Sequence, residues 1–223
     1  MQNSRAVFPE NSLDWRFLLP ITSESKILVI GRGCGHIQRY LMNLGLSEVF
    51  YCTGHEPQIA DLGDNSPQSN LLTYSELGMK SQFLSFFDIV VYPNGLSDNE
   101  AESLEIISFI KKYIRPGGAL FISFANELFS RKTTSGYYSY LWQIKKILKK
   151  TGYAIREIYG AIPDQHVPEY VFPLTPRAIG FIVRHRYAHK VPNLLLRLMA
   201  SPFAAVLFSN FFPAYFVVAT VAI

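Results

Sequence analysis

The chain has 223 residues, 49% of them apolar, and its 21 basic and 17 acidic residues give a net charge of +4. This composition supplies a hydrophobic core and excludes an intrinsically disordered chain. The mild charge lacks the concentrated basic stripe of a nucleic-acid-binding protein, and two cysteines are too few for a disulfide framework or a four-cysteine zinc site.

Residues 1–25 are expected to be a lead-in to one domain over residues 26–223. No secretory signal is visible in this sequence, so we expect a cytoplasmic protein with reduced cysteines. An apolar strand over Lys26–Ile30 leads into three glycines at alternate positions, Gly31, Gly33 and Gly35. Glycine adopts positive φ and lets a ligand approach the backbone. A helix over Gly35–Leu44 follows, so this segment predicts a nucleotide-binding corner.

Strands and helices then alternate along the chain, which predicts a doubly wound parallel sheet. The further strands are expected at Glu48–Thr53, Leu71–Tyr74, Phe87–Tyr92, Ala119–Phe124, Tyr153–Tyr159 and Tyr215–Val221. The further helices are expected at Glu56–Leu62, Asn99–Ile114 and Tyr138–Lys150. The two long helices have apolar faces, formed by Leu104, Ile107, Ile110 and Ile114 in one and by Leu141, Ile144, Ile147 and Leu148 in the other.

The C-terminal residues 198–223 carry no charge, and a run of this length is long enough to span a bilayer. Pro202 and Pro213 interrupt it, and Tyr215–Val221 is rich in strand-favouring residues. We therefore favour a buried strand, and membrane contact through residues 198–223 is the alternative.

Four segments together resemble the class I S-adenosylmethionine-dependent methyltransferases. They are the glycine corner Ile30–Gly35, the strand and turn Phe87–Leu96, the helix, Pro-Gly-Gly turn and strand of Ile110–Asn126, and the last strand Tyr215–Val221. The resemblance implies an α/β fold. Its sheet would be Rossmann-like, doubly wound, seven-stranded and mostly parallel, with an antiparallel last strand and helices on both faces. It also implies S-adenosyl-L-methionine as the cofactor.

The resemblance assigns a set of residues to the cofactor: Gly31, Arg32, Gly33, Cys34, Gly35, His55, Glu56, Tyr92, Pro93 and Asn94. Two positions depart from the family pattern, because Val29 stands where an acid usually precedes the first glycine and Cys52-Thr53 stand where a ribose-binding acid usually ends the second strand. Glu56 is the nearest acid. A non-catalytic methyltransferase-like binding module, membrane-associated through the apolar C-terminus, is therefore the alternative. A nicotinamide enzyme is disfavoured, because its motif would have glycine where His36 stands.

The methyl acceptor is expected at a substrate-side insertion, residues 161–212. The polar loop Gly160–Tyr170 contains His166 and Tyr170, the candidate proton acceptors of methyl transfer. The basic cluster at residues 184–190 suggests a subsite for an amphiphilic or phosphate-bearing molecule. His185 and His189 lack a third ligand, so no metal is expected. Tyr92-Pro93-Asn94 does not match the Asn-Pro-Pro motif of base methylation, which favours a small-molecule acceptor over a nucleic-acid substrate. The resemblance to the family implies oxygen as the methylated atom.

Overall fold

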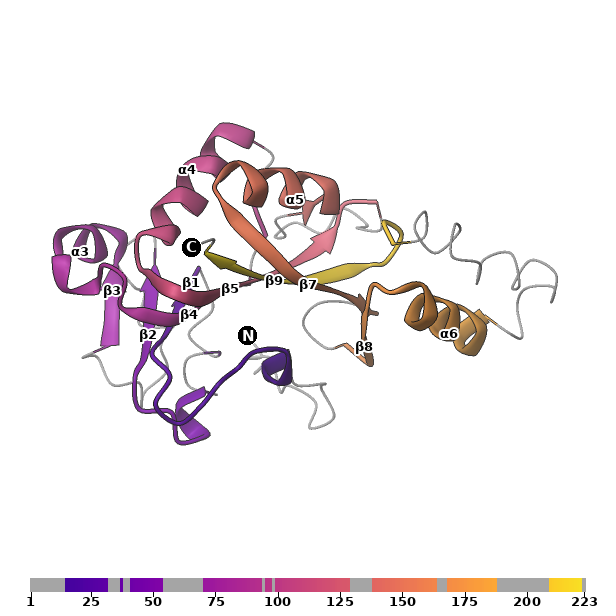
Figure 1. The fold of residues 1–223 in the computed structure, drawn as a ribbon, viewed down its shortest axis with the longest axis horizontal. Coiled ribbons are helices and arrows are strands. Elements are labelled where there is room, and N and C mark those ends of the chain that lie inside the picture. Colours follow the sequence, from indigo (N-terminus) through magenta and orange to yellow (C-terminus); the bar gives the residue numbers. More distant parts are fainter. Residues whose placement is uncertain are drawn as a thin grey trace, which may run out of the picture.

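The computed structural model describes residues 15–31, 37, 41–53, 70–93, 95–97, 99–128, 138–163, 168–187 and 209–221. Its centre is one mixed sheet with the strand order β3-β2-β1-β4-β5-β9-β7-β8, in which β6 pairs with β5 (Figure 1). This order is that of a doubly wound sheet: the chain moves outward from β1 to β3 and then crosses back to β4. The expected Rossmann-like architecture is confirmed, and two short strands, β6 and β8, add to the seven that were expected.

The parallel half of the sheet consists of five strands. They are β1 (Ile27–Ile30), β2 (Val49–Thr53), β3 (Leu71–Thr73), β4 (Phe87–Tyr92) and β5 (Ile114–Asn126). All four side chains of β1 are buried, because β1 lies between β2 and β4 and both faces of the sheet are covered. Continuous apolar sequences are typical of such strands, which is why the sequence locates β1, β2 and β4 to within one residue.

The antiparallel half consists of β7 (Tyr153–Ile162), β8 (Tyr170–Pro173) and β9 (Ala214–Val221). The last strand, β9, lies between β5 and β7 and runs antiparallel to both. Six of its eight residues are buried, so this part of the apolar C-terminal run is a core strand, as the favoured interpretation predicted. No helix among the described residues has both the length and the hydropathy to cross a bilayer.

The start of β5 differs from the sequence-based expectation. Helix α4 (Glu100–Lys111) is capped by Asn99, whereas the expected helix included this residue. The helix ends three residues early, and Ile114 opens β5 instead of closing the helix. Residues 115–118 of β5 bulge away from β4, between the paired residues Ile114 and Ala119, where the register shifts between Phe87 and Ile89. The bulge accommodates Gly117, with φ +78°, and Gly118, where a Cβ would lie 2.7 Å from a side-chain carbon of Ile114. The Pro-Gly-Gly element therefore shapes a strand rather than preceding one.

The beginning of the next helix also differs. Helix α5 covers Leu141–Lys150, and the preceding Tyr138–Ser139 form the short strand β6, parallel to β5. The inward face is confirmed, since Leu141, Ile144, Ile147 and Leu148 are all buried. Strand β7 continues to Ile162 and Tyr170 begins β8, so the expected loop from Gly160 to Tyr170 is shorter and lies between these strands.

Helices pack on both faces of the sheet. Buried residues of α3 (Tyr74–Met79), α4, α5 and α6 (Pro176–Tyr187) belong to one core cluster. Ile37 and Leu41, both helical, belong to a second cluster with Val29 and Tyr51. Gly45 follows with φ +85° and donates its N–H to the carbonyl of Met42, which confirms the expected end of this helix. The expected helix Glu56–Leu62 lies outside the described residues.

Candidate functional site

The candidate site lies where the carboxyl ends of β1 and β4 meet. The strand order reverses between these two strands, and ligands of open α/β sheets bind at such a switch point. The register pairs Val29 with Val91, and extending it by two residues places Gly31 beside Pro93. The expected residues Gly31, Tyr92 and Pro93 thus lie together at this edge, on strands about 4.8 Å apart.

Gly31 makes a fixed turn at the end of β1. Its φ is 145°, a conformation that is essentially restricted to glycine. Its N–H donates to the carbonyl of Cys52 at 3.1 Å. Its own carbonyl accepts a hydrogen bond of 2.7 Å from the buried hydroxyl of Tyr51. The backbone is therefore anchored on both sides at the point where the glycine corner begins.

The end of β4 is fixed by a serine on the neighbouring strand. The Ser123 hydroxyl on β5 donates to the carbonyl of Pro93 at 3.0 Å, and the Ser123 carbonyl accepts the N–H of Gly95 at 3.0 Å. Ser123 is buried, and Gly95 has φ +70°. The backbone that follows β4 is thus hydrogen-bonded to β5 at both Pro93 and Gly95.

A thiol near the end of β2 and a carboxylate in the first turn of α3 have structural roles. Burial raises the pKa of the Cys52 thiol to about 12, and the Glu76 charge adds to this, so Cys52 stays protonated and is not a nucleophile. Glu76 accepts a 2.7 Å hydrogen bond from the N–H of Thr73, and this bond is the main cause of its lowered pKa. Thr73 and Glu76 form a capping box at the start of α3.

A buried amide organises the end of β5. The Asn126 side chain donates to the carbonyls of Asn210 and Phe212, at 2.8 and 2.9 Å. The Tyr215 hydroxyl donates to the carbonyl of Ser209 at 2.9 Å and accepts the N–H of Phe212 at 3.0 Å. Burial raises the pKa of Tyr215 to about 12. These contacts hold residues 209–213, which lead into β9, against the same edge of the sheet.

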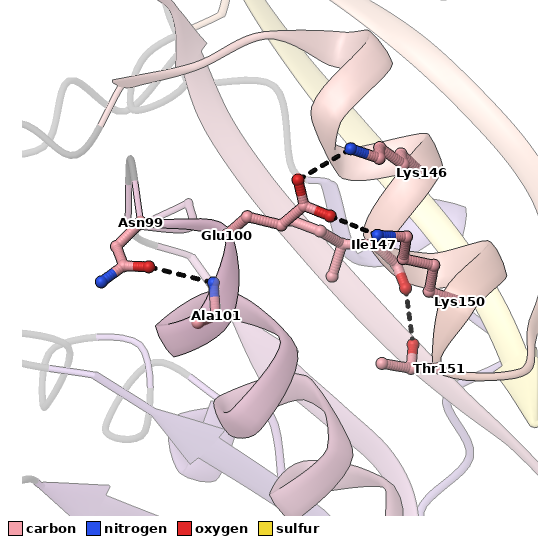
Figure 2. Close-up of polar contacts among 7 residues, drawn as sticks. All are labelled: Asn99, Glu100, Ala101, Lys146, Ile147, Lys150 and Thr151. Carbon is pink, nitrogen blue, oxygen red and sulfur yellow. Dashed lines mark hydrogen bonds and ion pairs between the residues drawn. The ribbon is translucent and has the colours of Figure 1, made fainter.

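An ion-pair cluster joins the neighbouring helices α4 and α5. Glu100 on α4 lies 2.7 Å from the Lys146 ammonium and 2.5 Å from that of Lys150, both on α5 (Figure 2). The hydrogen bonds from these two lysines lower the pKa of Glu100 to about 2. Glu100 is therefore ionised near neutral pH and is not a general base. It fixes the start of α4, which follows the end of β4.

Several expected site residues lie outside the described part of the chain: Arg32, Gly33, Cys34, Gly35, His55, Glu56, Asn94 and His166. Their roles stay predictions. Tyr170 is half-buried on β8, five strand positions from β1, or about 24 Å at about 4.8 Å per strand. The sheet therefore does not bring Tyr170 directly beside Gly31, and its role as a proton acceptor also stays a prediction.

The sequence analysis missed Tyr51 and Ser123. Each is a hydroxyl-bearing residue next to apolar residues of its strand, and that was the available signal. A buried hydroxyl is usually hydrogen-bonded, and here each one holds the backbone of the candidate site.

The described residues fit part of an S-adenosylmethionine site. A turn with a glycine-only φ stands at the switch point, and hydrogen bonds to Tyr51 and Cys52 anchor its backbone. Val29 is buried in the core, so the end of β1 offers no carboxylate at that position. No group of three histidine, cysteine or acidic residues suitable for a metal ion occurs among the described residues.

Solved structures share this fold at low sequence identity. An S-adenosylmethionine-dependent methyltransferase from Mesorhizobium loti matches with a TM-score of 0.55 at 14% identity, covering 92% of this chain and 94% of its own. The phosphoethanolamine N-methyltransferase 2 of Haemonchus contortus matches with 0.50 at 18% identity, covering 93% of this chain and 51% of its own. The [4+2]-cyclase SpnF matches with 0.58 at 13% identity, covering 93% and 78%.

No protein-family model matches the sequence, and no curated protein matches it either. The structural matches show that the chain has the fold of class I S-adenosylmethionine-dependent methyltransferases.

Proposed function

We propose that this chain binds S-adenosyl-L-methionine at the β1–β4 switch point and transfers its methyl group to a small molecule. The observation that carries the proposal is the turn at Gly31, which has a glycine-only φ and is anchored by Tyr51 and Cys52. It stands at the one place in this strand order where a doubly wound sheet binds its ligand. The fold of solved methyltransferases supports the same assignment.

The cofactor would supply an activated methyl group on a sulfonium. The chain's part is to hold the two reacting centres in line, which alone accounts for much of the rate of such a displacement. The backbone at Gly31 would lie against the cofactor. Pro93 and Gly95, held by Ser123, would bound it on the side of β4. Arg32, Gly33, Cys34, Gly35, His55, Glu56, Tyr92 and Asn94 complete the proposed cofactor set, and His166 and Tyr170 are the proposed proton acceptors.

The acceptor is proposed to be a small molecule methylated on oxygen, amphiphilic or bearing a phosphate. The absence of an Asn-Pro-Pro motif after β4 supports a small molecule over a nucleic acid as the acceptor, because Tyr92-Pro93-Asn94 stands there. A neighbour of the same fold is named for phosphoethanolamine, a small phosphate-bearing molecule. We place the protein in the cytoplasm, since its buried Cys52 is a free thiol.

The experiment that tests the proposal measures release of S-adenosylhomocysteine from S-adenosylmethionine in the presence of small hydroxyl-bearing, carboxyl-bearing and amine-bearing acceptors. We expect release that depends on one acceptor class and is lost in Gly31→Ala. If the chain bound a nicotinamide dinucleotide and bound neither S-adenosylmethionine nor S-adenosylhomocysteine, the proposal would be contradicted.

The second candidate function is a binding module, or a different reaction, on the same fold. Two observations favour it: Val29 is buried where methyltransferases usually have an acid, and a [4+2]-cyclase shares the fold. Binding of S-adenosylhomocysteine without methyl transfer to any acceptor class would favour this second candidate.

A further inference from the structure

One face of helix α6 is exposed and combines cations with aromatic rings. Arg177, Phe181, Arg184 and His185 are all exposed, and their spacing places them on one side of a helix. Phe181 leaves 65% of its surface exposed. The opposite side of α6 is covered, because Ile179, Ile182 and Val183 are buried in the core. We refer to the four exposed residues as the α6 face.

The side chains of the α6 face are available for binding. The two arginines form no ion pair or hydrogen bond with the part of the chain that the structure describes. The Phe181 ring is stacked on the His185 ring, with centroids 5.8 Å apart and planes 5° apart. The Phe181 ring is therefore held on the surface between two arginines rather than folded into the core.

The α6 face lies at one end of the molecule. Helix α6 is at the opposite end of the sheet from α3, beyond the edge strand β8 (Figure 1). The ring of His185 lies 6.1 Å from that of Tyr170, which pairs with Ile162, the last residue of β7. Strands β7 and β5 are both antiparallel to β9 and so run in the same direction. The end of α6 therefore lies at the same edge of the sheet as the carboxyl ends of the parallel strands.

We propose that the α6 face docks on an anionic lipid surface, with Phe181 inserted at the level of the headgroups and Arg177 and Arg184 over lipid phosphates. An exposed aromatic residue flanked by arginines is typical of helices that lie in a membrane interface. Charge complementarity selects anionic over neutral lipid. The sequence that follows α6 also contains cations and apolar residues, since Lys190 precedes and Arg197 follows the apolar Leu194–Leu196.

Lipid fits this face better than nucleic acid does. The described residues of the α6 face offer two arginines, too few for the row of phosphate contacts that gives nucleic-acid binding its affinity. The most exposed group at its centre is a phenyl ring, which a headgroup layer can bury. This inference does not depend on the proposed methyl transfer, because it concerns a different surface.

The test is flotation of the full chain with vesicles of phosphatidylcholine alone and of phosphatidylcholine with one third phosphatidylglycerol. We expect binding to the anionic vesicles only, weakened by high salt because salt screens exposed charges. Each arginine within reach of an anionic surface contributes about fivefold, so Arg177→Gln with Arg184→Gln should lower the partition coefficient about 25-fold. Phe181→Ala should lower it about tenfold.

Matched controls lie away from α6. Lys80→Gln with Lys112→Gln removes the same charge from exposed sites at the ends of α3 and α4, and Met79→Ala removes an exposed apolar side chain from α3. Both controls should bind like the wild type. Equal loss in control and α6 variants, equal binding to both vesicles, or arginine-dependent binding of a DNA duplex without vesicle binding would each overturn the proposal. S-adenosylmethionine binding, measured on the same samples, should be the same in all variants. A failure of the lipid-docking proposal can therefore be told apart from a failure of the proposed cofactor binding.

Discussion

The hydroxyl of Tyr51 anchors the Gly31 turn, and its removal is the most informative single-atom change in the chain. Tyr51→Phe deletes a buried hydrogen bond of 2.7 Å and leaves the Gly31 carbonyl without that donor. A buried hydrogen bond contributes about 1 kcal/mol net, and a carbonyl left unpaired costs about 1–3 kcal/mol. We expect Tyr51→Phe to lower the free energy of unfolding by about 1–2 kcal/mol, at the lower end of the cost of an unpaired carbonyl.

Tyr153 provides the matched control, because the same change there has the opposite sign. Tyr153 is also buried, and its hydroxyl has no hydrogen-bond partner among the described residues. An unpaired buried hydroxyl costs about 1–3 kcal/mol by protein mutational data. Tyr153→Phe should therefore leave the free energy of unfolding unchanged or raise it by about 1 kcal/mol.

The assay is urea denaturation of both variants and the wild type, followed by circular dichroism and fitted with a common slope. The two variants should differ by about 2 kcal/mol, which corresponds to about 4–8 °C in Tm for a chain of this length. Titration with S-adenosylmethionine on the same samples should show weaker binding for Tyr51→Phe only. If Tyr153→Phe is as destabilising as Tyr51→Phe, the hydrogen-bond reasoning behind the anchored turn is refuted.

Three further predictions test the supporting structure. Gly118→Ala should lower the free energy of unfolding by about 1–3 kcal/mol, because the added Cβ would overlap the β5 bulge. Gly78→Ala on α3 has open space around the added Cβ and should raise the free energy of unfolding by about 0.5–1 kcal/mol. Urea denaturation measures both changes, and two changes of the same sign would contradict the packing described for Gly118. Asn126→Ala should cost about 2–4 kcal/mol, because two carbonyls lose their donor, and protease sensitivity near residues 209–213 should rise; an unchanged digestion pattern would refute its role. Glu100→Gln should lower the free energy of unfolding at neutral pH. Urea denaturation at several pH values should show that the difference in this free energy between variant and wild type shrinks as pH falls from 4.5 toward 2, because the pKa of Glu100 in the folded state is lowered to about 2 and the carboxylate stops stabilising the fold once it is protonated. A difference that grows below pH 4.5 would contradict the ion-pair assignment.

The strands of the parallel half could be predicted from the sequence because burial on both faces requires continuous apolar runs. The run Ile27–Ile30 is four apolar residues followed by a glycine, and all four are buried in β1. The last strand could be predicted for the same reason, because Pro202 and Pro213 in the apolar C-terminal run argue against a membrane-spanning helix. The fold class followed from the order of these segments.

The missed features depend on contacts between distant segments. Strands β6 and β8 are two and four residues long, too short for any periodicity, and they exist because β5 and β7 offer them an edge. The bulge at Gly118 depends on how β5 pairs with the start of β4, which the local sequence does not encode. The anchoring roles of Tyr51 and Ser123 require knowing which carbonyl lies opposite each hydroxyl. Propensity and spacing carry no such information.

The central claim is that S-adenosylmethionine binds at the Gly31 turn, and calorimetric titration tests it most directly. The wild type should bind S-adenosylmethionine and S-adenosylhomocysteine with micromolar Kd. Gly31→Ala should weaken both at least tenfold, because a non-glycine residue at φ 145° costs about 1–3 kcal/mol. Gly45→Ala carries similar backbone strain at φ +85° away from the switch point, and it should bind like the wild type. No binding by the wild type at millimolar ligand, or equal losses in the two glycine variants, would contradict the account.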